Sequence, residues 1–193
     1  MNVHISNIRK SCYSEIREIS HIRPFIDEKS TTQLIISRLV ISKLDYCNCL
    51  FYNMSSENFH QLQLVQNHAA RIIKKAPKTA SATSILKELH WLPIKQRVSY
   101  KIALIVFKCL YIENFPSYLK ELITIYKPPR SLRSADQFLL NKPFKKLSTF
   151  GQKCFHYAAP EVWNSLPLDL RCCKSLPVFK RNLKTHLFKI SFP

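Results

Sequence analysis

Apolar residues recur at three- and four-residue steps through the first part of the chain, which is the period of an amphipathic helix. Between residues 3 and 21 the apolar positions are Ile5, Ile8, Cys12, Ile16 and Ile19. We therefore predict a helix over residues 3–21. Arg23 and Pro24 end it, because a residue that precedes proline disfavours helical backbone angles.

The same period predicts a series of further helices. Their limits are Ser30 or Thr31 to about Leu44, Ser55 or Ser56 to a point before Pro77, Thr83 or Ser84 through Leu89, Pro93 to about Ile112, and residues 117–123. Serine and threonine mark several of the starts, since their hydroxyls accept bonds from first-turn amides. The helix after Pro93 is apolar on more than one face, so we expect it at the centre of the core.

Composition changes at residues 126–129, where two adjacent prolines favour an extended connector. Residues 138–140 and 145–148 then flank a polar turn and are compatible with a small basic β-hairpin near residues 137–149. Helices are expected over 150–163, with Pro160 interrupting or ending the first of them, and over 175–188. The predicted fold class is mainly α, an irregular helical bundle, with a boundary near residue 126 that separates residues 1–125 from 126–193.

Charge narrows the choice of partners. The chain carries 30 Lys and Arg against 12 Asp and Glu, a net charge of +18. The excess rises along the chain: residues 1–50 carry 7 basic and 5 acidic side chains (+2), 51–125 carry 10 and 4 (+6), and 126–193 carry 13 and 3 (+10). Such a field attracts polyanions, so a nucleic-acid face is expected mainly in the last third. The alternative is a basic, solvated surface that serves only solubility.

Location and redox state follow from two simpler features. Seven cysteines, an odd number, occur without a secretory leader, which indicates reduced thiols in an intracellular compartment, nuclear or cytoplasmic. The longest apolar run, residues 102–110, contains Lys108 and is too short to cross a bilayer. No membrane contact is expected.

Five motifs stand in a fixed order along nearly the whole chain. They are LDYCN at residues 44–48, LQLVQNHAAR at 62–71, LKELHWLP at 86–93, RSLRS at 130–134 and AAPEVWNSLP at 158–167. In this order they resemble the region downstream of the polymerase palm in LINE-type (non-LTR) retrotransposon reverse transcriptases. The resemblance implies a thumb-like, connecting region over residues 1–125 and a basic carboxyl-terminal region over 126–193. It also implies a parent protein whose palm domain would be a partner.

Catalytic chemistry is not expected. A polymerase palm holds two metal ions with paired carboxylates, whereas the aspartates here are the separate Asp27, Asp45, Asp136 and Asp169. The interpretation of Asp45 is a helix-end or turn residue. Residues 1–45 also look similar to a short module named after an alkylation-repair dioxygenase homologue, but no histidine has the Asp two positions later that this chemistry needs.

No cofactor, metal or small-molecule substrate is predicted either. Cysteine and histidine spacings lack the paired two-to-four pattern of a zinc site, and the single glycine, Gly151, cannot build a phosphate-binding loop. Trp91 and Trp163 are interpreted as packing anchors, and His90 as a structural histidine. The amides Gln63, Gln66 and Asn67 either contact a partner or form the wet side of their helix, the option that we favour.

Candidate nucleic-acid-binding residues form three groups. The first is Arg130, Arg133, Lys142, Lys145, Lys146 and Lys153, among serines and aromatic rings that can stack on unpaired bases. The second is Arg71, Lys74 and Lys75, together with Lys78, at a helix end where cations also offset the helix dipole. The third is Lys180, Arg181 and Lys184 on the last helix, with Lys189 nearby.

These features lead to one expectation and one rival. We expect a non-catalytic carboxyl-terminal fragment of an RNA-directed DNA polymerase that retains at most binding of RNA or an RNA–DNA hybrid. The rival is a helical protein-interaction module, or a decayed element remnant, with no role in nucleic-acid binding. Exposed apolar helix faces would then be half of an interface with the missing palm.

Overall fold

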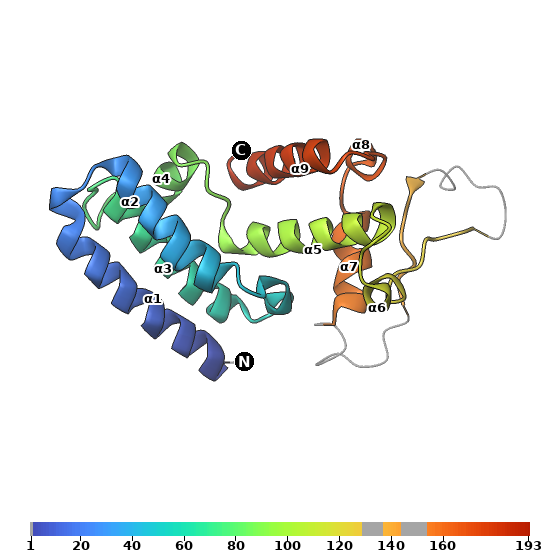
Figure 1. Ribbon diagram of the computed structural model, residues 1–193, viewed down its shortest axis with the longest axis horizontal. Coiled ribbons are helices and arrows are strands. Elements are labelled where there is room, and N and C mark those ends of the chain that lie inside the picture. Colours follow the sequence, from blue (N-terminus) through green and yellow to red (C-terminus); the bar gives the residue numbers. More distant parts are fainter. Residues whose placement is uncertain (1, 129–136, 144–153) are drawn as a thin grey trace. The chain divides into compact units, whose positions relative to one another are not determined.

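The computed structural model describes residues 2–128, 137–143 and 154–193. These residues are mainly helical, as predicted, and Figure 1 follows the helices along the chain from blue to red. The chain divides into two compact units. The first contains Met1–Asn48, Met54–Arg97 and Phe188–Pro193, and the second contains Cys49–Asn53 and Val98–Leu187. Residue 126, where the sequence predicts a boundary, lies inside the second unit.

The first unit is built around α1 (Asn2–Ile22) and α3 (Ser56–Ile73), which pack against each other. Most of the predicted apolar stripe of α1 is buried, with Ile5 and Cys12 fully so and Ile16 and Ile19 nearly so, while Ile8 is half-buried. Arg23 and Pro24 do end α1, in the 3-10 turn η1 (Arg23–Phe25). Burial of this stripe supplies the hydrophobic driving force for packing α1 onto its neighbours.

The second predicted helix begins earlier than its sequence suggests. Asp27, not Ser30 or Thr31, is the N-cap of α2 (Glu28–Ile35), and its carboxylate accepts from the amides of Lys29 at 3.0 Å and Ser30 at 3.3 Å. The hydrogen bond from the Ser30 side chain, and then the amides of Ser30 and Lys29, lower the pKa of Asp27. After Ile35 the chain continues as the π-helix η2 (Ile36–Leu44), where the Asp45 amide donates to the Val40 carbonyl five residues earlier at 2.8 Å.

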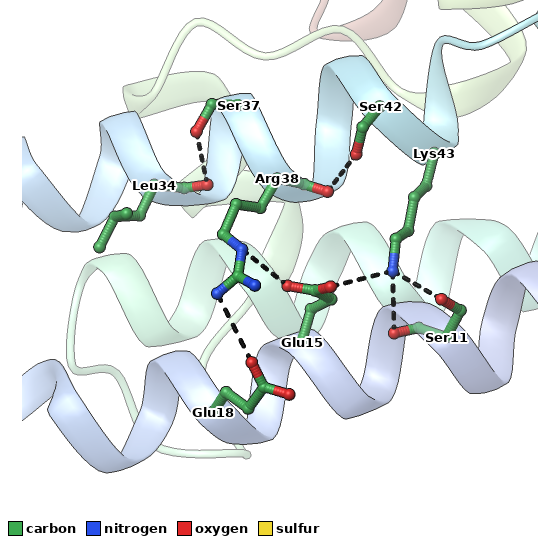
Figure 2. A network of polar contacts seen from close by, with 8 residues as sticks. All are labelled: Ser11, Glu15, Glu18, Leu34, Ser37, Arg38, Ser42 and Lys43. Atoms are coloured by element: carbon green, nitrogen blue, oxygen red, sulfur yellow. Dashed lines mark hydrogen bonds and ion pairs between the residues drawn. The ribbon is translucent and has the colours of Figure 1, made fainter.

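A network of polar contacts joins α1 to η2 (Figure 2). Glu15 lies 3.0 Å from Arg38 Nε and 3.2 Å from Lys43 Nζ, so one carboxylate faces two cations. Lys43 also donates to the Ser11 hydroxyl at 2.6 Å, and Glu18 is 3.5 Å from Arg38. Long-range pairs of this kind set which faces of α1 and η2 meet.

Two helix ends in the first unit use left-handed residues in place of glycine. After α3, Lys75 has φ 49°, and the amides of Lys75 and Ala76 bond back to the carbonyls of Ile72 and Arg71 at 3.2 and 3.0 Å. This is the Schellman pattern of helix termination.

The same pattern ends α4 (Ala82–Glu88). His90, at φ 53°, lies there in the left-handed position, and the Trp91 amide donates to the Leu86 carbonyl at 2.9 Å. The His90 ring packs against Phe188 with centroids 5.5 Å apart, although His90 itself is exposed.

The second unit has an aromatic core. It contains most of α5 (Ile94–Tyr111), with α6 (Ser117–Lys120), α7 (Phe155–Asn164), α8 (Leu168–Arg171) and most of α9 (Leu176–Ser191). The rings of Phe107 and Phe179 stack with centroids 4.4 Å apart, and Trp163 lies 5.9 Å from Phe179. Trp163 is fully buried and Trp91 is 7% exposed, so both tryptophans are packing anchors as predicted.

The predicted β-hairpin is not seen in residues 137–143, and residues 144–149 lie outside the described part of the chain. Leu140 instead forms an isolated antiparallel bridge with Ile125. Asn164 at the end of α7 completes the pairing of Leu140, accepting from its amide at 2.8 Å and donating to its carbonyl at 2.9 Å. A side chain from a distant helix thus satisfies the groups that a second strand would have paired.

Pro160 does not interrupt α7, contrary to the prediction. The helix runs from Phe155 through Pro160 to Asn164, and Ala158, Ala159, Pro160, Val162 and Trp163 are all buried. Proline removes one intrahelical hydrogen bond and crowds the preceding turn. Burial of this apolar segment offsets that loss and keeps the helix continuous.

Candidate nucleic-acid interface

The basic residues predicted to bind nucleic acid lie in different parts of the structure. Five of them lie outside the described residues: Arg130, Arg133, Lys145, Lys146 and Lys153. Lys142 is exposed beside the Ile125–Leu140 bridge. The remaining candidates gather at two places, the carboxyl-terminal end of α3 in the first unit and α9 in the second.

A pocket of about 530 Å³ opens at the carboxyl-terminal end of α3. Its walls come from α1, from η1, from the last turns of α3 and from the segment that follows α3. Four cationic side chains line it, Arg23, Arg71, Lys75 and Lys78, together with His68 and Ser20. No carboxylate is among its lining residues. We refer to it below as the cationic pocket.

Arg23 is held at the base of this pocket by main-chain oxygens. Its Nε donates to the Ile72 carbonyl at 3.0 Å, Nη2 to the Ile73 carbonyl at 2.7 Å, and Nη1 to the Ile26 carbonyl at 2.7 Å. The last carbonyls of a helix have no partner within the helix. Arg23, which is only 8% exposed, supplies a partner for the Ile73 carbonyl from 50 residues away and a further donor for the Ile72 carbonyl, which the Lys75 amide also reaches.

The other three cations differ in how firmly they are held. Arg71 donates from Nε and Nη2 to the Ala80 carbonyl at 3.2 and 3.1 Å, which orients its guanidinium. Lys75 and Lys78 are exposed and make no ion pair with any residue that the structure describes. Two fixed guanidiniums and two unpaired ammonium groups therefore share one concave surface.

Lys74, which was predicted to bind with this group, does not line the pocket and instead pairs with two glutamates. Its Nζ lies 2.7 Å from Glu28 and 2.6 Å from Glu88, and these hydrogen bonds raise the pKa of Lys74 above its ordinary value. The adjacent Lys75 is the left-handed residue of the Schellman motif, and its side chain lines the pocket. Two consecutive lysines thus have different electrostatic surroundings.

The pKa of His68 is affected by the positive charges around the pocket. Burial lowers the pKa of its imidazole below the ordinary 6.5, and the nearby charges of Arg71 and Lys78 lower it further. Its ring meets the Tyr13 ring edge-on, with centroids 5.8 Å apart. His68 is therefore neutral at pH 7 and presents one ring N–H donor and one acceptor.

On α9 the buried and charged faces are separate. Phe179, Leu183 and Leu187 point into the core, while Lys180, Arg181, Lys184 and Lys189 are exposed. None of these four cations is ion-paired within the described residues. Like charges three and four residues apart weaken a helix, so this stripe is held by the packing of the apolar face.

The polar side of α3 is structural at Gln66, which corrects the preference for a solvated role at that residue. Gln66 is fully buried and donates to the Leu92 carbonyl at 2.9 Å. Gln63 accepts from the Ile94 amide at 3.0 Å and donates to Asn67 at 2.8 Å. Gln63 and Gln66 tie the loop after α4 to α3; Gln66 does so from a buried position, whereas Gln63 and Asn67 are half-buried.

The described residues contain no cluster of side chains arranged as metal ligands, and the carboxylate of Asp45 is held in local hydrogen bonds. The Asp45 carboxylate accepts from Arg97 Nε at 2.8 Å and from Asn48 at 3.2 Å, in agreement with its interpretation as a turn residue. No three His, Cys, Asp or Glu side chains of the described part converge as metal ligands would.

The sequence analysis missed Arg23, His68 and Ser20 as pocket residues. They belong to different segments, and no spacing or motif links residues 20–23 to the end of α3. Only the positive charge of the segment after Ala70 pointed to the right region. None of the described helices is long and apolar enough to cross a membrane.

Comparison with known proteins finds no match: no family model, no curated protein and no solved structure proves similar to the chain. The function has to be inferred from the residues of the chain itself.

Proposed function

We propose that this chain is the region downstream of the palm in a LINE-type reverse transcriptase, without catalytic residues of its own, and that it binds RNA or an RNA–DNA hybrid. The five ordered motifs support the family, and the net charge of +18 supports a polyanionic partner. The nuclear site of action is part of this proposal and follows from the family.

The cationic pocket is the observation that carries the binding proposal. Surface lysines of a solvated protein are usually interspersed with carboxylates, as Lys74 is with Glu28 and Glu88. The pocket gathers four cations with no carboxylate in its lining. Phosphate oxygens are the ligands that fixed guanidiniums and mobile ammonium groups bind best.

The exposed face of α9 is a second contact candidate. Lys180 and Lys184 lie one helical turn apart, and Arg181 lies beside them. An exposed row of unpaired cations on a packed helix can follow a phosphate backbone without reading bases. The two surfaces belong to different units, so each is tested separately.

The test is binding of the purified chain to single-stranded RNA, duplex DNA and an RNA–DNA hybrid across a salt series. Each phosphate contact contributes about 0.7–0.9 to the slope of log K against log salt concentration. We expect K75Q/K78Q to reduce that slope by about 1.5, and K180Q/K184Q to reduce it by a similar amount if α9 contributes.

A matched control variant loses the same two positive charges at positions outside the pocket. Lys10 and Lys29 are exposed, unpaired among the described residues, and outside the cationic pocket. K10Q/K29Q should therefore change the slope by much less than K75Q/K78Q. Equal slopes for both double variants would mean that only net charge matters and would count against a defined interface. Template-dependent primer extension with Mg²⁺ would contradict the proposal that the chain has no catalytic residues.

A protein-interaction module is the second candidate, and apolar exposure in the second unit favours it. Ile125 is 55% exposed and Phe138 47% exposed, and with Leu110, Tyr111 and Leu140 they line a hollow of about 120 Å³. A face that normally packs on a palm domain would leave such side chains uncovered. A solution mass that rises with concentration and does not respond to RNA would favour this candidate.

A further inference from the structure

We infer that the cationic pocket binds a phosphomonoester, the dianionic group at the end of a nucleic-acid strand or on a free nucleotide. This inference rests on the proposed function and specifies the group that the first unit would hold. It differs from backbone binding, in which each phosphate is a singly charged diester inside a continuous strand.

Charge is the first argument. A phosphomonoester carries about −1.5 to −2 at pH 7 and offers three acceptor oxygens, whereas a backbone diester carries one negative charge and two free oxygens. The pocket places Arg23, Arg71, Lys75 and Lys78 around one space with no lining carboxylate. The excess of positive charge matches the more highly charged group.

Shape is the second argument. Sequence-independent strand binding uses open grooves that continue past each nucleotide. Here the lining residues come from two separate parts of the chain: Ser20 and Arg23 at the end of α1 and in η1, and His68, Arg71, Lys75 and Lys78 at the end of α3 and after it. A volume of about 530 Å³ lies within the usual range for small-ligand sites, roughly 300–1,000 Å³. The pocket is large enough for a terminal nucleotide, whose phosphate lies at the end of the strand.

The main objection is the helix end itself, because the carboxyl-terminal end of a helix dipole repels anions. Arg23 removes much of this objection, since its guanidinium covers the Ile72 and Ile73 carbonyls. A guanidinium has five N–H groups, and three of those on Arg23 are used on carbonyls. The two that remain, and the positive charge, can be directed to a ligand in the pocket.

Preorganisation is the third argument. The bonds of Arg23 and of Arg71 to carbonyls fix both guanidiniums before any ligand arrives, which lowers the entropic cost of binding. Lys75 and Lys78 make no competing ion pair with a described residue and can close on the bound oxygens. Neutral His68 adds an uncharged hydrogen-bond donor.

The experiment compares one oligoribonucleotide in three forms, with a 5′-phosphate, with a 3′-phosphate, and with hydroxyls at both ends, bound to the full chain. Adenosine monophosphate, adenosine and inorganic phosphate serve as competitors. We expect one phosphorylated form to bind about tenfold more tightly than the hydroxyl form, the factor that one added charge-assisted hydrogen bond provides. Competition by the nucleotide and not the nucleoside would show that a free phosphomonoester is also accepted.

Variants locate the effect. K75Q/K78Q should abolish the preference for the phosphorylated end, and K10Q/K29Q should keep it. The side chains of Lys75 and Lys78 make no described hydrogen bond or ion pair, so this double variant should stay folded; its circular dichroism must match that of the parent chain.

The outcomes separate this inference from the proposed function. Equal affinity for all three oligonucleotides, or a preference that survives in K75Q/K78Q, would overturn the phosphomonoester site and leave nucleic-acid binding standing. Binding of adenosine monophosphate that depends on Lys75 and Lys78, without binding of any oligonucleotide, would support the site and overturn the proposed function.

Discussion

Arg23 Nη2 donates to the main-chain carbonyl of Ile73 over 2.7 Å, across 50 residues of sequence. This one contact joins the end of α1 to the end of α3, and it places a buried positive charge at the base of the cationic pocket. The same side chain therefore holds the two helix ends together and lines the pocket for which binding is proposed.

Replacing Arg23 with alanine should destabilise the chain by about 3 kcal/mol, because three carbonyls lose a charged donor and two of them end a helix. Urea unfolding followed by circular dichroism measures the change. Arg17, exposed and six residues earlier in the sequence, is the control, and R17A should stay within about 0.5 kcal/mol of the parent. A similar small change for R23A would mean that water replaces the guanidinium without cost.

Lys75 offers a variant in which stability and binding should move in opposite directions. Its φ of 49° costs a side-chain-bearing residue about 1 kcal/mol that glycine avoids. K75G should therefore raise the free energy of unfolding by about that amount and weaken phosphate binding. K75A is the matched control, with the same loss of charge and no gain in stability; binding that survives in both variants would remove Lys75 from the site.

The pKa of His68 should respond to its neighbours and to ligand. Burial, Arg71 and Lys78 all lower it, so K78Q should raise it and R71Q should raise it more, while K10Q should leave it unchanged. Bound phosphate should also raise it, since an anion stabilises the imidazolium. Ring-proton chemical shifts followed by NMR across pH 4–8 measure all four cases.

The sign of the stability effect follows from the same shift. Because the folded chain holds the His68 pKa below 6.5, the unfolded chain binds more protons in the window just below that value. The contribution of His68 to stability is present above pH 6.5 and falls as the pH drops through that window. H68Q should flatten this part of the curve of unfolding free energy against pH, and an unchanged curve would contradict the expected shift.

Thiol labelling tests the packing of both units at once. Burial raises the pKa of Cys12 and of Cys109 to about 11, while Cys47, Cys154 and Cys172 are exposed. At pH 8 the exposed three should be alkylated first, and Cys12 and Cys109 at least about a thousandfold more slowly, because they react only after opening. Peptide mass spectrometry gives the order, and all seven should react in denaturant. Early labelling of Cys12 would contradict the packing of α1.

The helices could be predicted because their signals are local. The apolar period of residues 3–21, the serine cap at Ser55 and the proline before α5 each act within a few residues of the helix they define. A residue four positions away always lies on the same helix face, whatever the rest of the chain does. The pairing of Leu140 could not be predicted, because its partners Ile125 and Asn164 are residues that no local pattern connects to it.

Lys74 and Lys75 show where sequence alone stops. As adjacent lysines they were equal candidates for an interface, and their positive charge was already determined by the sequence. Only tertiary structure decided that Lys74 meets Glu28 and Glu88 while Lys75 lines a pocket with Arg23 and Arg71. The reason is physical: net charge and helical period are properties of the chain itself, but the field at one side chain depends on which distant groups packing brings within a few ångströms.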